Sequence, residues 1–141
     1  MLSFTSYFTA FLLLTTASSD LLEKFAPNRY YVTVEINAIC ERDLSTTISL
    51  HDEDQFFDDD LAIVHVTDGK PVTLDGFEKE YGTFQPYIRL IGTCNGKPHM
   101  LRHLIPKEFI YNAKVMGHPI YEVEVDLDKA NNVATDSKTY S

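Results

Sequence analysis

The stretch Pro86-Tyr-Ile-Arg-Leu-Ile-Gly-Thr-Cys94, followed by Ile105-Pro-Lys-Glu-Phe-Ile110, decides the fold class of this chain. The first segment alternates toward a terminal cysteine with the period-two pattern of a β-strand. After a short loop and a second strand, an Ile-Pro start predicts a one-turn helix near Pro106-Ile110, because proline is favoured at the first helical position. This order of elements predicts a small β-sandwich.

Other stretches carry the same strand signal. The clearest is Tyr31 to Cys40, where Val32, Val34 and Ile36 share one face. Turn dipeptides such as Asp68-Gly69 and Asn95-Gly96 separate the strands. Helical periodicity is nearly absent, so we expect an all-β fold: a seven-stranded antiparallel, immunoglobulin-like sandwich. The expected strands are residues 31–40, 47–51, 61–67, 72–77, 86–94, 100–104 and 120–127.

The two ends of the chain read differently from its middle. Phe4 to Leu14 is apolar or small, small residues follow, and the first charge is Asp20. This pattern predicts a cleaved signal peptide over residues 1–19, with a membrane anchor or a buried helix as the alternatives. The run is shorter than the roughly 20 residues of a bilayer span, so no transmembrane span is expected. The domain then covers 20–128, and the polar residues of 129–141 predict a disordered tail.

Charge and cysteine content restrict the partners and the compartment. A net charge of −9 argues against nucleic acid, which is bound by dense Lys and Arg patches. The chain contains two cysteines, Cys40 and Cys94, and no Cys-x-x-Cys motif. In a small secreted chain a disulfide between them is the default, and two buried free thiols are the alternative. We therefore expect a secreted, extracellular protein.

Over most of the mature chain, the order of these landmarks resembles the nematode transthyretin-like family of secreted proteins. The matching residues are Cys40, the Ile48-x-Leu50-x-Asp52 strand before an acidic loop, the Thr67-Asp68 turn, Gly76-x-x-Lys79-Glu80, Pro86-Tyr87-Ile88 with Cys94, and Ile105-Pro106-x-x-x-Ile110.

This resemblance implies a transthyretin-type sandwich and roles at cell surfaces, including bridging to lipid or receptor, without fixing a ligand. Two departures stand out: Gly92 occupies a position where the family often has histidine, and two further cysteines of the family are missing. Their joint loss fits a single bridge between Cys40 and Cys94. Because a fold alone does not transfer function, the site has to be argued from the residues.

An enzymatic reading finds little support in the sequence. Hydroxyisourate hydrolases of the wider superfamily use histidine and arginine at strand ends and a C-terminal Tyr-Arg-Gly-Ser. This chain ends Lys138-Thr-Tyr-Ser141, and its first strand contains no histidine. We expect no enzymatic activity, no catalytic residues and no cofactor, with a hydroxyisourate-type hydrolase or a small-ligand carrier as the alternatives. A carrier of the transthyretin kind needs a tetramer with a central channel.

Two groups of residues are candidates for metal binding. His99 and His103 lie on an expected strand, where residues four apart are roughly 13 Å apart and cannot share one ion. His51 or His65 from another strand could join one of them, but scattered polar histidines are the commoner case. The loop from Asp52 to Asp60 has six carboxylates among nine residues, which Ca²⁺ could use as ligands. It lacks the EF-hand pattern, so we expect a solvated, mobile loop and no metal.

Phe56 and Phe57 lie at the centre of this acidic loop and predict one of two arrangements. The pair either tucks under the sandwich edge or stands exposed as a contact surface. We expect a secreted, non-enzymatic binding or signalling module whose ligand is an extracellular protein or a cell-surface or lipid ligand. The candidate binding loop comprises Asp52, Asp54, Phe56, Phe57, Asp58, Asp59 and Asp60.

Overall fold

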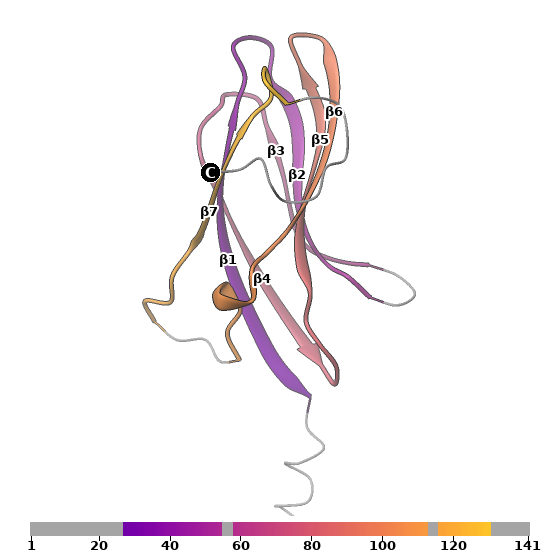
Figure 1. Cartoon of the computed structure of the whole chain (residues 1–141), viewed down its shortest axis with the longest axis vertical. Helices are drawn as coiled ribbons and strands as arrows, with labels where there is room; N and C mark the ends of the chain where they lie inside the picture. The colour runs from indigo at the N-terminus through magenta and orange to yellow at the C-terminus, as the bar shows by residue number, and fades with distance from the viewer. Residues whose placement is uncertain (1–26, 55–57, 113–115, 131–141) are drawn as a thin grey trace, which may run out of the picture.

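A computed structural model describes residues 27–54, 58–112 and 116–130 as two β-sheets, shown in Figure 1. The expected signal peptide, Phe56 and Phe57, and residues 131–141 of the expected tail lie outside the described residues. Within those ranges, no helix has the length and apolar character needed to cross a bilayer. The described residues form two β-sheets and a single 3₁₀ turn, so the expected all-β class is confirmed.

The first sheet has three strands in the order β4-β1-β7. β1 (Asn28–Ile39) pairs antiparallel with β4 (Val72–Glu80) but parallel with β7 (Tyr121–Asp126). The expectation of a purely antiparallel fold is therefore wrong for the β1–β7 pair. Parallel neighbours need a crossover connection rather than a hairpin, and here the chain reaches β7 only after building the other sheet.

The second sheet has four antiparallel strands in the order β3-β2-β5-β6. The strands are β2 (Ser45–Asp52), β3 (Asp59–Val66), β5 (Pro86–Cys94) and β6 (Lys97–Leu104). Asn95 and Gly96 join β5 to β6 with φ angles of 51° and 74°. Positive φ at both central residues is what a tight two-residue hairpin requires, and this explains the Asn-Gly dipeptide.

The hydrophobic core lies between the sheets and follows the alternation of the strands. Val34 and Ile36 of β1 face Ile48 and Leu50 of β2, and all four are fully buried. Burial of each such side chain contributes about 1.5–3 kcal/mol. The expected inward faces of the first two strands are confirmed.

At one position, the close packing of β5 against β2 requires a glycine. Gly92 pairs with Thr46, and a Cβ at Gly92 would lie 2.2 Å from the carbonyl oxygen of Ser45. No side chain fits there without separating the strands, because real Cβ contacts do not approach that closely. The histidine that the resembled family often carries at this position has no room in this chain.

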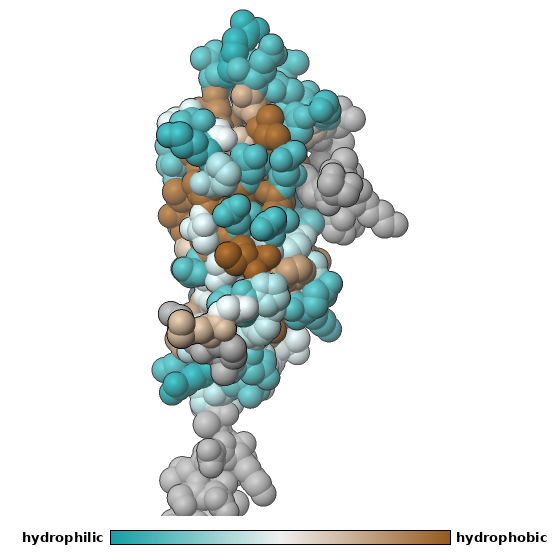
Figure 2. Space-filling view, turned by 90° about the vertical axis from the view of Figure 1, so that its left-hand side faces the viewer, coloured by the Kyte–Doolittle hydropathy of each residue, from teal (hydrophilic) through white to brown (hydrophobic). Residues whose placement is uncertain are grey.

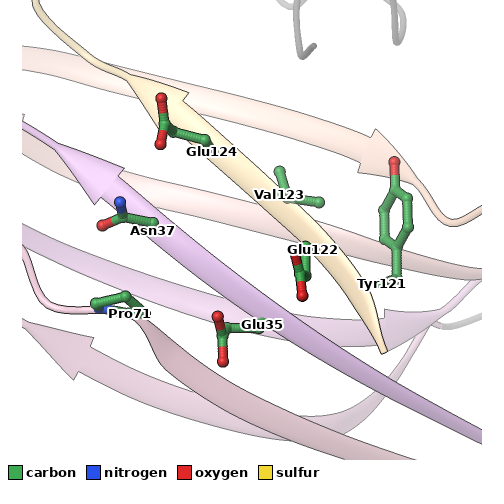
Figure 3. A pocket seen from close by; sticks show the side chains of 7 residues that line it. All are labelled: Glu35, Asn37, Pro71, Tyr121, Glu122, Val123 and Glu124. Carbon is green, nitrogen blue, oxygen red and sulfur yellow. The ribbon is translucent and has the colours of Figure 1, made fainter. Parts of the chain in front are cut away.

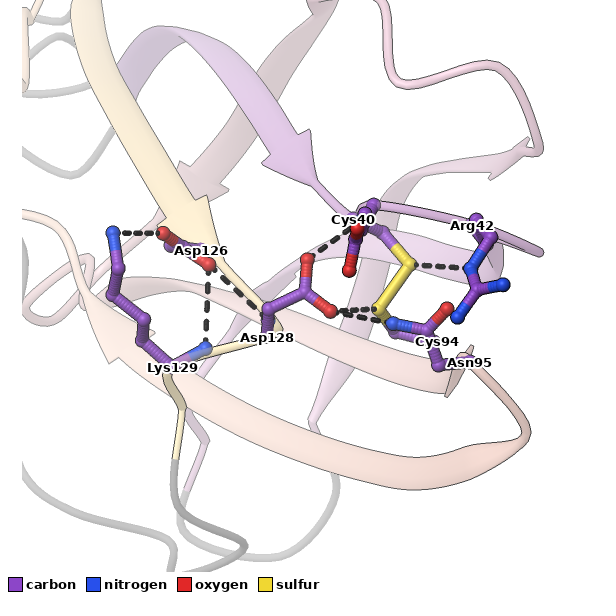
Figure 4. The surroundings of a disulfide bond; sticks show 8 residues. Cys40, Arg42, Cys94, Asn95, Asp126, Asp128 and Lys129 are labelled. Carbon is purple, nitrogen blue, oxygen red and sulfur yellow. Dashed lines mark hydrogen bonds and ion pairs between the residues drawn. A yellow bond between two sulfur atoms is a disulfide. The ribbon is translucent and has the colours of Figure 1, made fainter.

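Two short features complete the fold. A 3₁₀ turn, η1 (Lys107–Phe109), occupies the place expected for a one-turn helix. A disulfide joins Cys40, just after β1, to Cys94 at the end of β5, with Cα atoms 5.8 Å apart. The expected pairing is confirmed, and it links one sheet to the other (Figure 4).

Candidate functional site

The structure places the residues of the predicted acidic loop in different surroundings. Asp52 is the last residue of β2, whereas Asp59 and Asp60 open β3, so the loop is the connection of a β-hairpin. Asp58, Asp59 and Asp60 are exposed, as a solvated loop predicts. Asp52 is fully buried, and for this residue the expectation of solvation is wrong. It continues the inward-facing series of β2, which alternation within the strand requires.

Asp52 lies among other carboxylates. Its Oδ1 accepts a hydrogen bond of 2.8 Å from the backbone N–H of Gln85, whereas Oδ2 is buried without a partner among the described residues. One carboxylate oxygen each from Asp52, Asp54 and Glu80 lie within 4.8 Å of one another. Burial raises the pKa of Asp52 to about 6; the Gln85 hydrogen bond opposes this rise, and the nearby carboxylates add to it.

The outward face of the four-stranded sheet carries a second group of notable residues. We call it the outer sheet face. Its cross-strand neighbours form three rows: His65, Thr47, Ile91 and Met100; Ile63, Ser49, Arg89 and Arg102; and Asp60, His51, Tyr87 and Leu104.

Large apolar side chains stand exposed around this face. Ile63 is 58% exposed, Ile91 44%, Met100 61% and Leu104 45%. Ile63 lies on β3, Ile91 on β5, and Met100 and Leu104 on β6. Ile91 and Met100 are cross-strand neighbours, whereas Ile63 and Leu104 lie on other rows; exposed apolar residues that adjoin one another mark contact surfaces. The sequence alternation placed them outward, but only the strand order brings them onto one face.

The middle of the outer sheet face is aromatic and basic. The Arg102 guanidinium lies 4.0 Å above the Tyr87 ring and forms an ion pair of 2.8 Å with Glu53. The Tyr87 hydroxyl donates a hydrogen bond to Asp58. Both ends of the loop are thereby attached to this face, so the expected binding loop and the outer sheet face form one continuous surface.

The outer sheet face also carries a chain of hydrogen bonds that the sequence did not predict. Ser49 Oγ lies 2.6 Å from His51 Nε2, and His51 Nδ1 lies 2.7 Å from Asp60 Oδ1. The register of β2 against β3 shifts after Leu50, which sets Asp60 opposite His51. The order of groups is that of a serine nucleophile with its base.

The surroundings of this chain do not favour nucleophilic chemistry. Ser49 is only 4% exposed, so its hydroxyl is withheld from a substrate, and a nucleophile has to reach the reacting carbon. Burial lowers the pKa of His51, Arg89 lowers it further, and Asp60 opposes the shift. The imidazole also stacks on Tyr87, with ring centroids 5.0 Å apart. The arrangement supplies hydrogen-bond partners to buried polar groups and orients His51.

His99 and His103 are both buried on β6 and face the core. His103 Nε2 lies within hydrogen-bond distance of the Tyr121 hydroxyl, and burial lowers the pKa of His103. An imidazole at an inward position of an alternating strand is the signal that could have predicted their burial.

The three-stranded sheet carries a hollow of about 330 Å³ on its outward side. Figure 3 shows its lining side chains on β1 and β7, with Pro71 ahead of β4. Three of them, Glu35, Glu122 and Glu124, are acidic, and the lining formed by the described residues includes no Lys or Arg. Figure 2 looks onto this side of the molecule, where hydrophilic residues interrupt the apolar patches. The hollow repels anions, and it differs in character from the outer sheet face.

Asp128 forms hydrogen bonds beside the disulfide, at one end of the sandwich. Asp128 accepts a hydrogen bond of 2.7 Å from the Glu41 N–H. It also accepts one of 2.6 Å from the Asn95 side-chain amide, as Figure 4 shows. Cys40, Cys94 and Asp128 lie close enough together to hold a metal ion. Both sulfurs are bonded to each other, however, and a thiolate is needed to ligate a metal. The contacts of Asp128 anchor the end of β7 to the rest of the domain.

Fold and site define the chain broadly, as an all-β, sandwich-like protein with a disulfide between its two sheets. Comparisons of the chain with models of known protein families, with curated proteins and with solved structures give no match.

Proposed function

We propose that this protein is a secreted, non-enzymatic binding module of the transthyretin-like type, acting at cell surfaces or in extracellular fluid. The sequence landmarks, the arrangement in two sheets and the disulfide support this assignment. A disulfide persists in oxidising compartments and is rare in reducing ones. The proposed ligand is an extracellular protein presented in solution or at a cell surface.

The observation that carries the proposal is the composition of the outer sheet face. Four exposed apolar side chains share this face with two exposed arginines, Arg89 and Arg102, and Arg102 covers the buried ring of Tyr87. Arginine and methionine are enriched in protein–protein contacts, and arginine is among the residues that often dominate the binding energy. We further propose that the acidic loop, including Phe56 and Phe57, extends this surface.

Charge indicates what kind of partner suits the face. Arg89 is exposed in its middle row, and in the described part of the chain no carboxylate forms an ion pair with it. Although the overall charge is −9, this face thus presents an arginine that forms no ion pair among the described residues. We infer a protein partner with an apolar patch that carries a carboxylate, since electrostatic complementarity directs specificity.

The test compares two double variants. Ile91→Ser with Met100→Ser removes neighbouring apolar groups from the face, whereas Tyr81→Ser with Met116→Ser removes exposed ones elsewhere. Both changes are at the surface, so the free energy of unfolding should stay within about 0.5 kcal/mol of the unaltered protein. Proteins retained from extracellular fluid by the tagged mature chain are then compared.

A partner retained by the unaltered chain and by the control, but lost with the face variant, supports the proposal. Equal retention by all three excludes the outer sheet face. Phe56→Ser with Phe57→Ser forms a separate arm: loss of binding with unchanged stability extends the surface to the loop. Unfolding of that variant instead places the two aromatic residues in the core.

A further inference from the structure

A cluster of three carboxylates at one end of the sandwich has no function in the proposal above. Asp52 ends β2 in the four-stranded sheet, Asp54 follows in the loop, and Glu80 ends β4 in the other sheet. Glu80 shares its strand face with Gly76, where a Cβ would touch Leu50 in the core. Asp52 and Glu80 therefore approach each other from the inward faces of the two sheets.

The spacing of these carboxylates suits a calcium ion. One oxygen from each lies within 4.8 Å of the others. Calcium–oxygen bonds are about 2.3–2.6 Å long, so two ligands of one ion are at most about 5 Å apart. Two separate segments, the end of β2 with the start of its loop and the end of β4, thus already place their oxygens where a single ion can reach all of them.

Asp52 provides an independent indication of a ligand. The residue is 0% exposed, and its Oδ2 has no hydrogen-bond partner among the described residues. A buried carboxylate oxygen is normally paired, because removing it from water costs several kcal/mol. The charges acting most strongly on it are negative, from Asp54, Glu80 and Glu78.

No cation of the protein offsets this charge in the described part of the chain. The ion pairs found there involve other carboxylates, such as Glu53 with Arg102 and Asp60 with His51. Carboxylates gathered in a partly buried site are stable together when a metal ion neutralises them. A cation from solution would supply the missing positive charge.

We propose that Asp52, Asp54 and Glu80 bind a calcium ion at the base of the β2–β3 loop. A bidentate carboxylate and water complete the six to eight oxygen ligands that Ca²⁺ takes. With only three carboxylates, we expect the weak affinity of extracellular modules, whose dissociation constants are about 10⁻⁴–10⁻³ M. The ion ties the loop of one sheet to the end of a strand in the other.

The ion also acts on the contact surface. Asp54 lies between Glu53, which pairs with Arg102, and Asp58, which accepts from Tyr87. Holding Asp54 fixes the loop segment that borders the outer sheet face. Calcium binding is nevertheless measured without any protein partner, so its failure and that of the proposed contact surface are distinguishable.

The test is calorimetric titration of the metal-free full chain with CaCl₂, and with MgCl₂ in parallel. Asp52→Asn removes a ligand charge, while its side-chain oxygen still accepts the bond from Gln85. Asp59→Asn is the matched control, because it makes the same charge change at an exposed neighbour. We expect saturable Ca²⁺ binding, weakened about tenfold or more by Asp52→Asn and unchanged by Asp59→Asn.

Three outcomes overturn the proposal: no calcium binding up to about 10 mM, equal weakening by both variants, or magnesium binding as tight as calcium binding. Equal weakening shows diffuse attraction by the acidic surface. If Asp52→Asn does not fold, Glu80→Gln replaces it, with the same expected loss of affinity. Circular dichroism of each metal-free variant establishes that it is folded before titration.

Discussion

Removing the disulfide should cost this domain a large share of its stability. Cys40 and Cys94 are 54 positions apart, so the bond closes a loop of about 55 residues in the unfolded chain. The chain-entropy relation gives about 14 cal/mol/K for a loop of that length, or about 4 kcal/mol at 25 °C. Domains are stable by only about 5–15 kcal/mol, so the loss brings the protein close to unfolding.

The perturbation is Cys40→Ala with Cys94→Ala, measured by urea unfolding. With a urea dependence of about 2 kcal/mol/M, the midpoint should fall by about 2 M. The chain has eight tyrosines and no tryptophan, so tyrosine fluorescence and circular dichroism are the suitable signals. The urea dependence should also steepen, because the unlinked denatured state exposes more surface.

The control is the unaltered protein under a reducing agent, which keeps both sulfur atoms and removes only the bond. The reduced protein should lose nearly as much as the double variant, and any extra loss in the variant measures the cavity left at Cys94, which is buried. A loss below about 1 kcal/mol in both refutes the reasoning, because the linkage then restricts the denatured state very little.

Two further predictions concern packing and pH. Gly92→Ala should lower the free energy of unfolding by about 1–3 kcal/mol, because the new Cβ meets the β2 backbone. Gly82→Ala is the control, because the nearest atom to its Cβ is 3.7 Å away. Equal urea midpoints for the two variants would contradict this prediction. Burial lowers the pKa of His103 in the folded state, so below pH 6.5 the unfolded state binds the extra proton. Stability should therefore fall with acidity by at most about 1.4 kcal/mol per pH unit, and less in His103→Gln; parallel pH profiles would show that His103 does not contribute.

Local patterns were sufficient for the parts of this protein that depend on one segment at a time. The alternation in β1 and β2 predicted which side chains enter the core, because side-chain direction along a strand follows from backbone geometry alone. Asn95-Gly96 predicted the β5–β6 turn, because few residues accept positive φ. Cysteine count and context predicted the bond between Cys40 and Cys94.

Tertiary structure alone decided which segments become neighbours. The parallel pairing of β1 with β7 joins distant parts of the chain, and no local pattern specifies it. Asp52 looked like part of a solvated loop, yet its burial and its approach to Glu80 depend on how the two sheets face each other. Exposure and electrostatics at a residue are properties of everything packed around it, so they appear only when the fold is complete.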